Sequence, residues 1–256
     1  MTIPKTAGRV SIERDGAVAV IRMRAGRANA MSAEMLSLMS DAVEEVRASD
    51  AEAAVFTGDG RFFSAGLALP DLIDLDRADM ASFMRSVDAG MKDILTLPIP
   101  TIAAIDGPAI AGGCVLALMC DLRVMSSSAR WIGLTEVRLS IGLPAMVVEA
   151  LRFRVPASSL TPIALVGELW SPDDALGLGL VDEVTEPSGV VDRAIARAGS
   201  LAGSPVAFAQ IKSSLLRPVV AEIERCGESE LDSWLETWFS TAGQAQVRSV
   251  VAALRR

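Results

Sequence analysis

Short apolar segments alternate with helix-like segments through the first half of this chain. The strand-like segments end at Gly, Pro or polar residues and cover 17–23, 53–57, 101–106 and 122–125. Apolar residues recur at helical spacing between them, over 32–47, 80–97 and 114–120. Strands that are joined by helices favour a parallel sheet, because a parallel connection needs a crossover of a dozen or more residues. The order of segments therefore predicts an α/β fold.

The pattern changes near residue 188, where strand-like segments end. Helices are expected from there at 190–202, 205–216, 221–238 and 245–255. We therefore divide the chain into a core, 1–187, and a C-terminal helical region, 188–256. This region holds Trp234, Trp238 and Phe239, in a chain with only 4 Trp, 7 Phe and no Tyr. Large aromatic side chains bury roughly 150–250 Å² each, so we expect these three to pack on the chain's own core or on a neighbouring subunit.

Composition excludes several classes of function. The chain contains no His, which rules out a Ser-His-Asp or Cys-His nucleophile, a His-ligated metal and a histidine base. A net charge of −8 argues against a nucleic-acid partner. The longest apolar stretches, 115–120 and 141–148, are far shorter than the ~20 residues of a membrane span. Three cysteines without a CxxC pair are typical of a reducing cytoplasm, where we expect this protein.

Glycines mark two loops that could bind an anion. Gly112 and Gly113 open an apolar helix after a strand and a Gly-Pro turn. Free N–H groups at a helix N-terminus can hold a phosphate, or a thioester oxygen as it gains negative charge. A second small-residue loop, 62–67, offers a further donor. The alternative is that Gly112 and Gly113 only allow close packing.

Five segments together resemble one known family. The residues Arg24 and Asn29-Ala30-Met31 are similar to its Arg-Pro-x-x-x-Asn-Ala-Leu/Met pattern. The other four segments follow in the family's order, at 63–67, 109–121, 132–137 and 169–184. On these residues the chain is identified as a member of the crotonase superfamily, the enoyl-CoA hydratase/isomerase family. The resemblance implies a spiral of ββα units with a C-terminal helical region that forms trimers, or hexamers made of two trimers.

The resemblance also implies the site. Glu136 would be the catalytic acid–base group, and the N–H groups of Leu67 and Gly112 would form an oxyanion hole. The substrate would be an acyl-CoA thioester, with no metal and no cofactor besides the coenzyme A of the substrate itself. Residues in contact with this substrate would be Ala28, Ala65, Leu67, Ala68, Leu69 and Gly112.

Three departures from the family pattern narrow the expected reaction. Val115 stands where hydratases with two catalytic glutamates carry the first of them, Ala68 replaces an aspartate, and Thr135 replaces a proline. One carboxylate above two N–H donors can move a double bond from C3 to C2, whereas hydration commonly shares its protons between two acids. The motifs are most similar to the Δ3,Δ2-enoyl-CoA isomerases. A hydratase (a lyase) and a non-catalytic acyl-CoA binder remain the alternatives.

Other polar residues have plainer interpretations. Glu149 is a rival acid but lies in an amphipathic helix, and Asp121 is expected to be structural at a helix–strand junction. Cys114 and Cys120 belong to an apolar helix and are expected in the core. In the helical region, Lys212 and Arg217 are candidates to offset the phosphates of coenzyme A. The aspartates before the second helix follow no calcium-loop spacing and suggest a solvated surface: Asp71, Asp74, Asp76 and Asp79.

Overall fold

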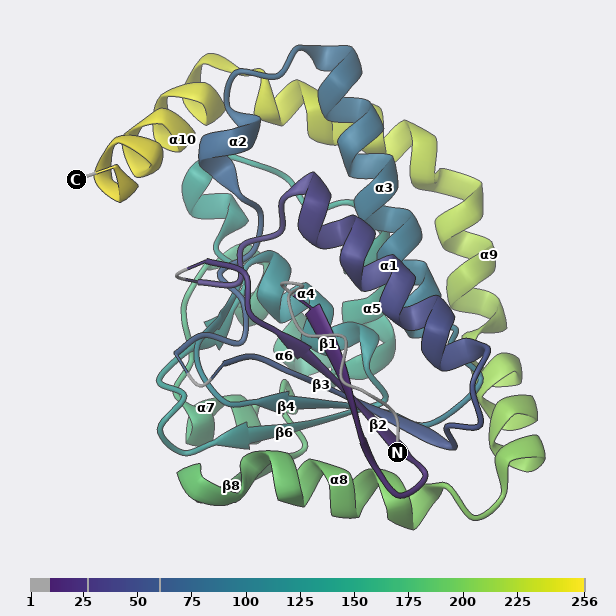
Figure 1. The fold of residues 1–256 in the computed structure, drawn as a ribbon. Helices are drawn as coiled ribbons and strands as arrows, with labels where there is room; N and C mark the ends of the chain where they lie inside the picture. Colours follow the sequence, from purple (N-terminus) through teal and green to yellow (C-terminus); the bar gives the residue numbers. More distant parts are fainter. Residues whose placement is uncertain (1–9, 27, 60, 256) are drawn as a thin grey trace.

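A six-stranded sheet forms the centre of the structure, a computed structural model that describes residues 10–26, 28–59 and 61–255 (Figure 1). The strand order is β1-β2-β3-β4-β6-β8; β1 pairs antiparallel with β2, and all other neighbours are parallel. A second sheet pairs β5 with β7 in parallel. The strands are β1 (Val10–Asp15), β2 (Val18–Met23), β3 (Ala53–Thr57), β4 (Thr101–Ile105), β5 (Ala109–Ile110), β6 (Leu122–Ser126), β7 (Ile132–Gly133) and β8 (Glu183–Thr185).

Helices connect the parallel strands and form the C-terminal region. They are α1 (Ala33–Arg47), α2 (Leu69–Leu72), α3 (Arg77–Leu95), α4 (Gly112–Met119), α5 (Ala145–Arg154), α6 (Ala157–Leu165), α7 (Pro172–Gly177), α8 (Val190–Leu201), α9 (Pro205–Trp238) and α10 (Thr241–Leu254). Two single 3₁₀ turns, η1 (Glu136–Leu139) and η2 (Pro187–Gly189), complete the list. The α/β class with a parallel sheet and C-terminal helices is confirmed.

The central strands β2, β3, β4 and β6 are buried on both faces, which explains why they are apolar. In β2, Val18 and Val20 face α8, whereas Ala19 and Ile21 face the main core. Side chains of a strand alternate between the two faces, so both sets must be apolar when helices cover both sides. Figure 1 shows α8 running along one face, with α1 and α3 on the other.

The structure differs from the expected elements at several places. The short strands β5, β7 and β8 were not expected, because two or three residues are too few for a sequence pattern. The strand β1 was not expected, because its sequence, VSIERD, carries three charged residues and its burial falls from intermediate to exposed along its length. The residues 205–238 form one helix rather than two, although Pro218 lies inside it. A proline removes one helical N–H donor and usually kinks or ends a helix. Buried Leu216 and Val219 on either side of Pro218 hold the helix on the core.

The aromatic residues of the C-terminal region pack on their own chain. The rings of Trp234 and Trp238 stack at 5.3 Å, and both side chains belong to the main core. Phe239 is half-buried against the same core. Of the two expected alternatives, packing on the chain's own core is the one that the structure shows for Trp234 and Trp238, because the chain itself already removes them from water. The division at residue 187 stays a prediction.

Asp121 ties the helix–strand junction to two other helices. Its Oδ2 accepts hydrogen bonds from the N–H and hydroxyl of Thr101, both at 3.0 Å, and lies 2.7 Å from the Lys212 ammonium. Its Oδ1 lies 3.2 Å from the Arg154 guanidinium. The structural role expected for Asp121 is confirmed. The role considered for Lys212 is wrong, because its ammonium is buried and already paired with Asp121.

No helix within the described ranges is long and apolar enough to cross a membrane.

The Asp121 network leads to a stability prediction. Asp121→Ala leaves two buried cations, Lys212 and Arg154, without their anion, so we expect the free energy of unfolding to fall by about 3–5 kcal/mol. Urea denaturation followed by circular dichroism measures the change. Asp74→Ala is the matched control, because Asp74 pairs with Arg248 on the surface and should cost at most about 1 kcal/mol. Equal losses in the two variants would contradict the argument.

Candidate active site

Three chain segments run parallel and in register at the small sheet. Ala109 in β5 pairs with Ile132 in β7, and Ser64 forms a further parallel bridge to Ala109. Backbone hydrogen bonds of 2.9 Å and 2.8 Å link Ile110 N–H to the Ser64 carbonyl and Ala111 N–H to the Gly133 carbonyl. Because parallel segments leave a sheet at the same edge, the residues three or four places onward meet there. Those residues are Leu67, Gly112 and Glu136.

The N–H groups of Leu67 and Gly112 are neighbours and are both available. A methyl carbon placed on the Cα of Gly112 would lie 3.5 Å from the nitrogen of Leu67 and 3.1 Å from the Cα of Gly66. No hydrogen bond within the described ranges uses either N–H. Gly112 is the first residue of α4, where N–H groups lack helical partners and the helix dipole is positive. Two such donors suit an oxygen that becomes negatively charged.

The backbone directly before Gly112 is strained, and the packed structure around it keeps it in that conformation. Ala111 has φ 52° and ψ −121°, outside the usual regions for a residue with a side chain. Strain of this kind costs on the order of 1–3 kcal/mol and is typical of functional sites. The next residue but one, Gly113, packs so closely that a Cβ there would lie 2.1 Å from the Ser64 carbonyl oxygen. Gly113 therefore serves close packing, while the nitrogen of Gly112 lies beside Gly66 of the neighbouring loop.

Asn29 joins its own segment, residues 25–29, to the loop 62–67. Its Oδ1 accepts a 2.7 Å hydrogen bond from Ala25 N–H, and its Nδ2 donates to the Phe62 carbonyl at 2.8 Å. The Ser64 hydroxyl donates to the Asn29 carbonyl at 2.8 Å and accepts a hydrogen bond from Gly66 N–H. The Asn-Ala pattern in the sequence thus marks a residue that positions Leu67 through the loop before it.

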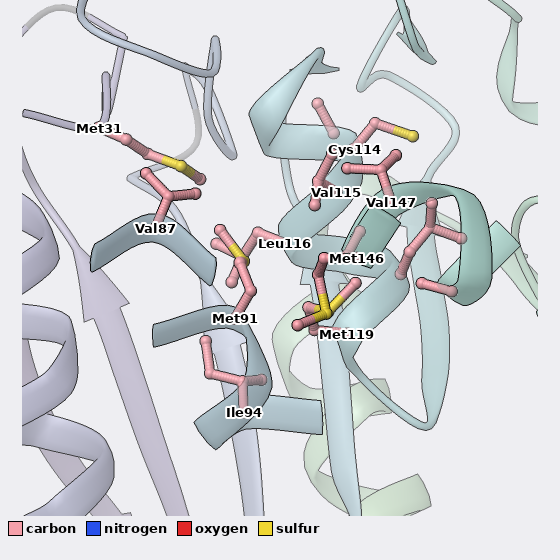
Figure 2. Close-up of a cluster of buried hydrophobic side chains, with 14 of the residues drawn as sticks. Met31, Val87, Met91, Ile94, Cys114, Val115, Leu116, Met119, Met146 and Val147 are labelled. Atoms are coloured by element: carbon pink, nitrogen blue, oxygen red, sulfur yellow. The ribbon is translucent and has the colours of Figure 1, made fainter. Parts of the chain in front are cut away.

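A cavity of about 240 Å³ lies beside these donors. Leu67 and Gly112 line it together with Glu136, and most of the remaining lining is apolar. Figure 2 shows apolar side chains that α3, α4 and α5 contribute to this region: Val87, Met91, Val115, Met146 and Val147, all of which line the cavity. Trp234 and Trp238 of α9 and Val250 of α10 complete the wall. The arrangement provides an apolar space with a few polar groups, as small-molecule sites do.

Glu136 is an acid held in an apolar setting. Its Oε2 is buried and makes no hydrogen bond within the described part of the chain. Burial raises its pKa from the usual 4.5 to about 7, and the backbone N–H groups of Glu136 and Thr135 oppose this shift. A carboxyl group that titrates near neutral pH can both take and return a proton. Glu136 thus differs from a solvated surface carboxylate.

The other predicted residues are distributed around this cavity. Ala65 and Leu69 line it. Ala28 and Ala68 lie next to the donor loop: the Ala28 carbonyl accepts from Ala65 N–H at 2.9 Å, and Ala68 N–H donates to the Met31 carbonyl at 3.1 Å. Neither lines the cavity, and their contact with substrate stays a prediction. Ala68 is the N-cap residue of α2, and its side chain cannot cap the helix. Backbone hydrogen bonds order this loop in place of the aspartate that the family pattern has at this position.

The remaining candidates lie outside the cavity. Glu149 pairs with Arg152 on α5. Cys114 and Cys120 are fully buried, and burial raises the pKa of both thiols, so their place in the core is confirmed. Asp76 caps α3, and Asp74 pairs with Arg248.

Sequence reasoning missed Asp88 and the two tryptophans as cavity residues. Asp88 lies between Met84 and Met91 on the apolar side of α3, and this helical spacing was a signal that could have been read. No local pattern could place Trp234 and Trp238 at the cavity, because α9 reaches it from a distant part of the sequence.

Comparison with known proteins agrees with this geometry. Residues 13–246 match the family model described as enoyl-CoA hydratase/isomerase. A putative enoyl-CoA hydratase of Thermus thermophilus is 33% identical over 81% of this chain and 83% of the relative. The mitochondrial enoyl-CoA delta isomerase 1 of Mus musculus is 30% identical over 84% of this chain and 76% of its own length.

Solved structures extend the similarity to the fold. The human mitochondrial delta3-delta2-enoyl-CoA isomerase superposes with a TM-score of 0.91 and 25% identity, over 96% of this chain and 98% of that one. A parallel sheet, strained donor loops and a buried glutamate thus accompany a family match over most of the sequence. The chain belongs to the enoyl-CoA hydratase/isomerase family.

The position of Glu136 leads to a pH prediction. We expect its carboxyl group to be protonated below pH 7 and ionised above it, because burial favours the neutral form. Infrared difference spectra between wild type and Glu136→Gln should be recorded at two pH values. About one pH unit below this pKa they should show the band of a protonated carboxyl group, and about one unit above it this band should be absent. A difference band already lost at pH 4.5 would contradict the buried assignment.

Proposed function

We propose that this protein moves the double bond of a 3-enoyl-CoA to the 2-position. The observation that carries the proposal is the meeting of Leu67 N–H, Gly112 N–H and the Glu136 carboxyl group at one apolar cavity. Donors suited to an oxyanion, beside a base with a pKa of about 7, are the groups that a proton shift next to a thioester requires.

In the proposed reaction Glu136 acts first as a base and then as an acid, while the two N–H groups stabilise the intermediate. The ionised Glu136 removes a proton from C2, and the electron pair moves through the conjugated system to the thioester oxygen. The N–H groups of Leu67 and Gly112 stabilise this dienolate. The protonated Glu136 then gives the proton to C4, the double bond forms between C2 and C3, and Glu136 is ionised again. The reaction involves no net oxidation, so we propose that it needs no cofactor besides the substrate's own coenzyme A.

Val115 favours isomerisation over hydration. The side chain lines the cavity at the place where the family pattern of two-glutamate hydratases has its first acid. An apolar group there neither holds nor deprotonates a water molecule. The similarity to the human and mouse isomerases supports the same choice.

Hydration of a 2-enoyl-CoA is the second candidate function. The relatives described as hydratases favour it, among them the short-chain-enoyl-CoA hydratase of Clostridium acetobutylicum, 29% identical over 96% of this chain and 95% of its own length. A non-catalytic acyl-CoA binder is the third candidate, distinguished by the absence of both activities. Three free cysteines support a cytoplasmic location for any of the three functions.

The activity prediction concerns Glu136→Gln. The variant keeps the volume of the side chain and loses the base, so we expect the rate of 3-enoyl-CoA isomerisation to fall by at least roughly 10²–10⁴-fold. The absorbance of the conjugated product measures the rate, and Glu149→Gln is the matched control with unchanged activity.

Three results decide between the candidates. Isomerisation by wild type that is lost in Glu136→Gln supports the proposal. Fast hydration of a 2-enoyl-CoA without isomerisation would favour the hydratase. Acyl-CoA binding without either reaction would favour the binder.

We also propose that the protein assembles as a homotrimer or as two stacked trimers. Apolar side chains remain exposed on α6 and on the first half of α9, including Leu165, Ile211 and Leu215. Cyclic symmetry would close a heterologous contact between such surfaces. Light scattering at micromolar concentration should give three or six times the chain mass. A fully active monomer would contradict this proposal.

A further inference from the structure

Asp88 places a second carboxyl group in the cavity, and the proposed reaction does not use it. It lies on α3 and lines the cavity together with Met84, Val87 and Met91. No hydrogen bond or ion pair within the described ranges involves its side chain. The α3 residues around Asp88 in the cavity wall are apolar, so none of them can replace the hydration that its carboxyl group loses when a ligand fills the cavity.

Ion pairs join α3 to α9 along a contact that we call the seam. They explain why no cation in the described residues pairs with the Asp88 carboxyl group. The two helices run antiparallel and are joined by ion pairs from Arg85 to Glu228 at 2.8 Å and from Lys92 to Glu224 at 2.5 Å. Arg85 and Lys92 are the cations within one turn of Asp88, and both are paired with acids of α9. The group that acts on Asp88 across the seam is Glu228, another anion.

Asp88 and Glu136 lie on different elements of the cavity wall. Burial and the charge of Glu228 raise the pKa of Asp88 to about 6, and Glu136 is not among the causes. Asp88 is likewise not among the groups that shift the pKa of Glu136. Asp88 reaches the cavity from α3, whereas Glu136 reaches it from the η1 turn and the two N–H donors from the loop 62–67 and the start of α4. When the thioester oxygen binds between the N–H groups of Leu67 and Gly112, the part of the acyl chain that reaches Asp88 is the part beyond the reacting carbons.

We propose that Asp88 is a specificity residue that accepts a hydrogen bond from a hydroxyl group on the acyl chain, beyond the double bond. The inference rests on the proposed function of the same cavity, and it identifies the substrate class as hydroxylated acyl-CoA thioesters. A hydroxyl group fits better than an ammonium group, because an ammonium loses far more hydration free energy on entering an apolar cavity. A plain alkyl chain would cover Asp88 and leave it without a partner.

Binding of saturated acyl-CoA tests the inference without any reaction. The probes are straight-chain acyl-CoA thioesters of several lengths, each with and without a hydroxyl group at the terminal carbon, measured by isothermal titration calorimetry. At the best-matched length, we expect wild type to bind the hydroxylated probe roughly 10- to 100-fold more tightly, as for a hydrogen bond to a charged acceptor. Asp88→Leu should reverse the preference, and Asp88→Asn should reduce it.

Two control variants separate this inference from the proposed function. Asp79→Asn changes an exposed aspartate of the same helix and should keep the wild-type preference. Glu136→Gln should also keep it, because binding of a saturated probe needs no base. Equal binding of both probes at every length, or a preference that survives Asp88→Leu, would overturn the inference. A preference that depends on Asp88, without turnover of any 3-enoyl-CoA, would uphold it and overturn the isomerase proposal.

Discussion

Parallel pairing at the small sheet decides where the reacting groups of this chain lie. The Ser64 bridge and the β5–β7 pair hold three segments in register, and each segment delivers one group at the same edge. A slip of one residue in any pairing would turn its side chains to the opposite face and displace its N–H group. This register sets the positions of the two N–H donors and of the acid, whereas contacts among Leu67, Gly112 and Glu136 contribute less.

Close approach and strain complete the donor pair. Gly66, with φ 83°, and Gly113 let the second loop and α4 meet at distances that a side chain would prevent. Ala111 bears backbone strain directly before Gly112, and Asn29 ties the opposite loop by its own hydrogen bonds. The free energy of the strain comes from the surrounding core, in which α4 is almost wholly buried. Rigid donors need little reorganisation when a negative charge develops between them.

Burial acts differently on the acids of this protein. At Asp121 two cations and Thr101 replace the lost hydration, and the result is a structural joint. At Glu136 burial raises the pKa, and at Asp88 burial and the charge of Glu228 do so; within the described residues no cation pairs with either carboxyl group, so both retain unused capacity for a proton or a hydrogen bond. This contrast is the physical reason for assigning the first to stability and the other two to the ligand.

The sequence by itself determined the alternation of strands and helices and the glycine-rich start of α4, because spacing and glycines act locally. Its motif order also pointed to Leu67, Gly112 and Glu136, although not to their distances. Only the tertiary structure decided that the Glu136 Oε2 atom is buried, that Lys212 pairs with Asp121 and that α9 closes the cavity with Trp234 and Trp238. It also decided that Pro218 does not end α9, since buried neighbours hold the helix across it. These properties depend on contacts between residues far apart in the chain, which no local pattern records.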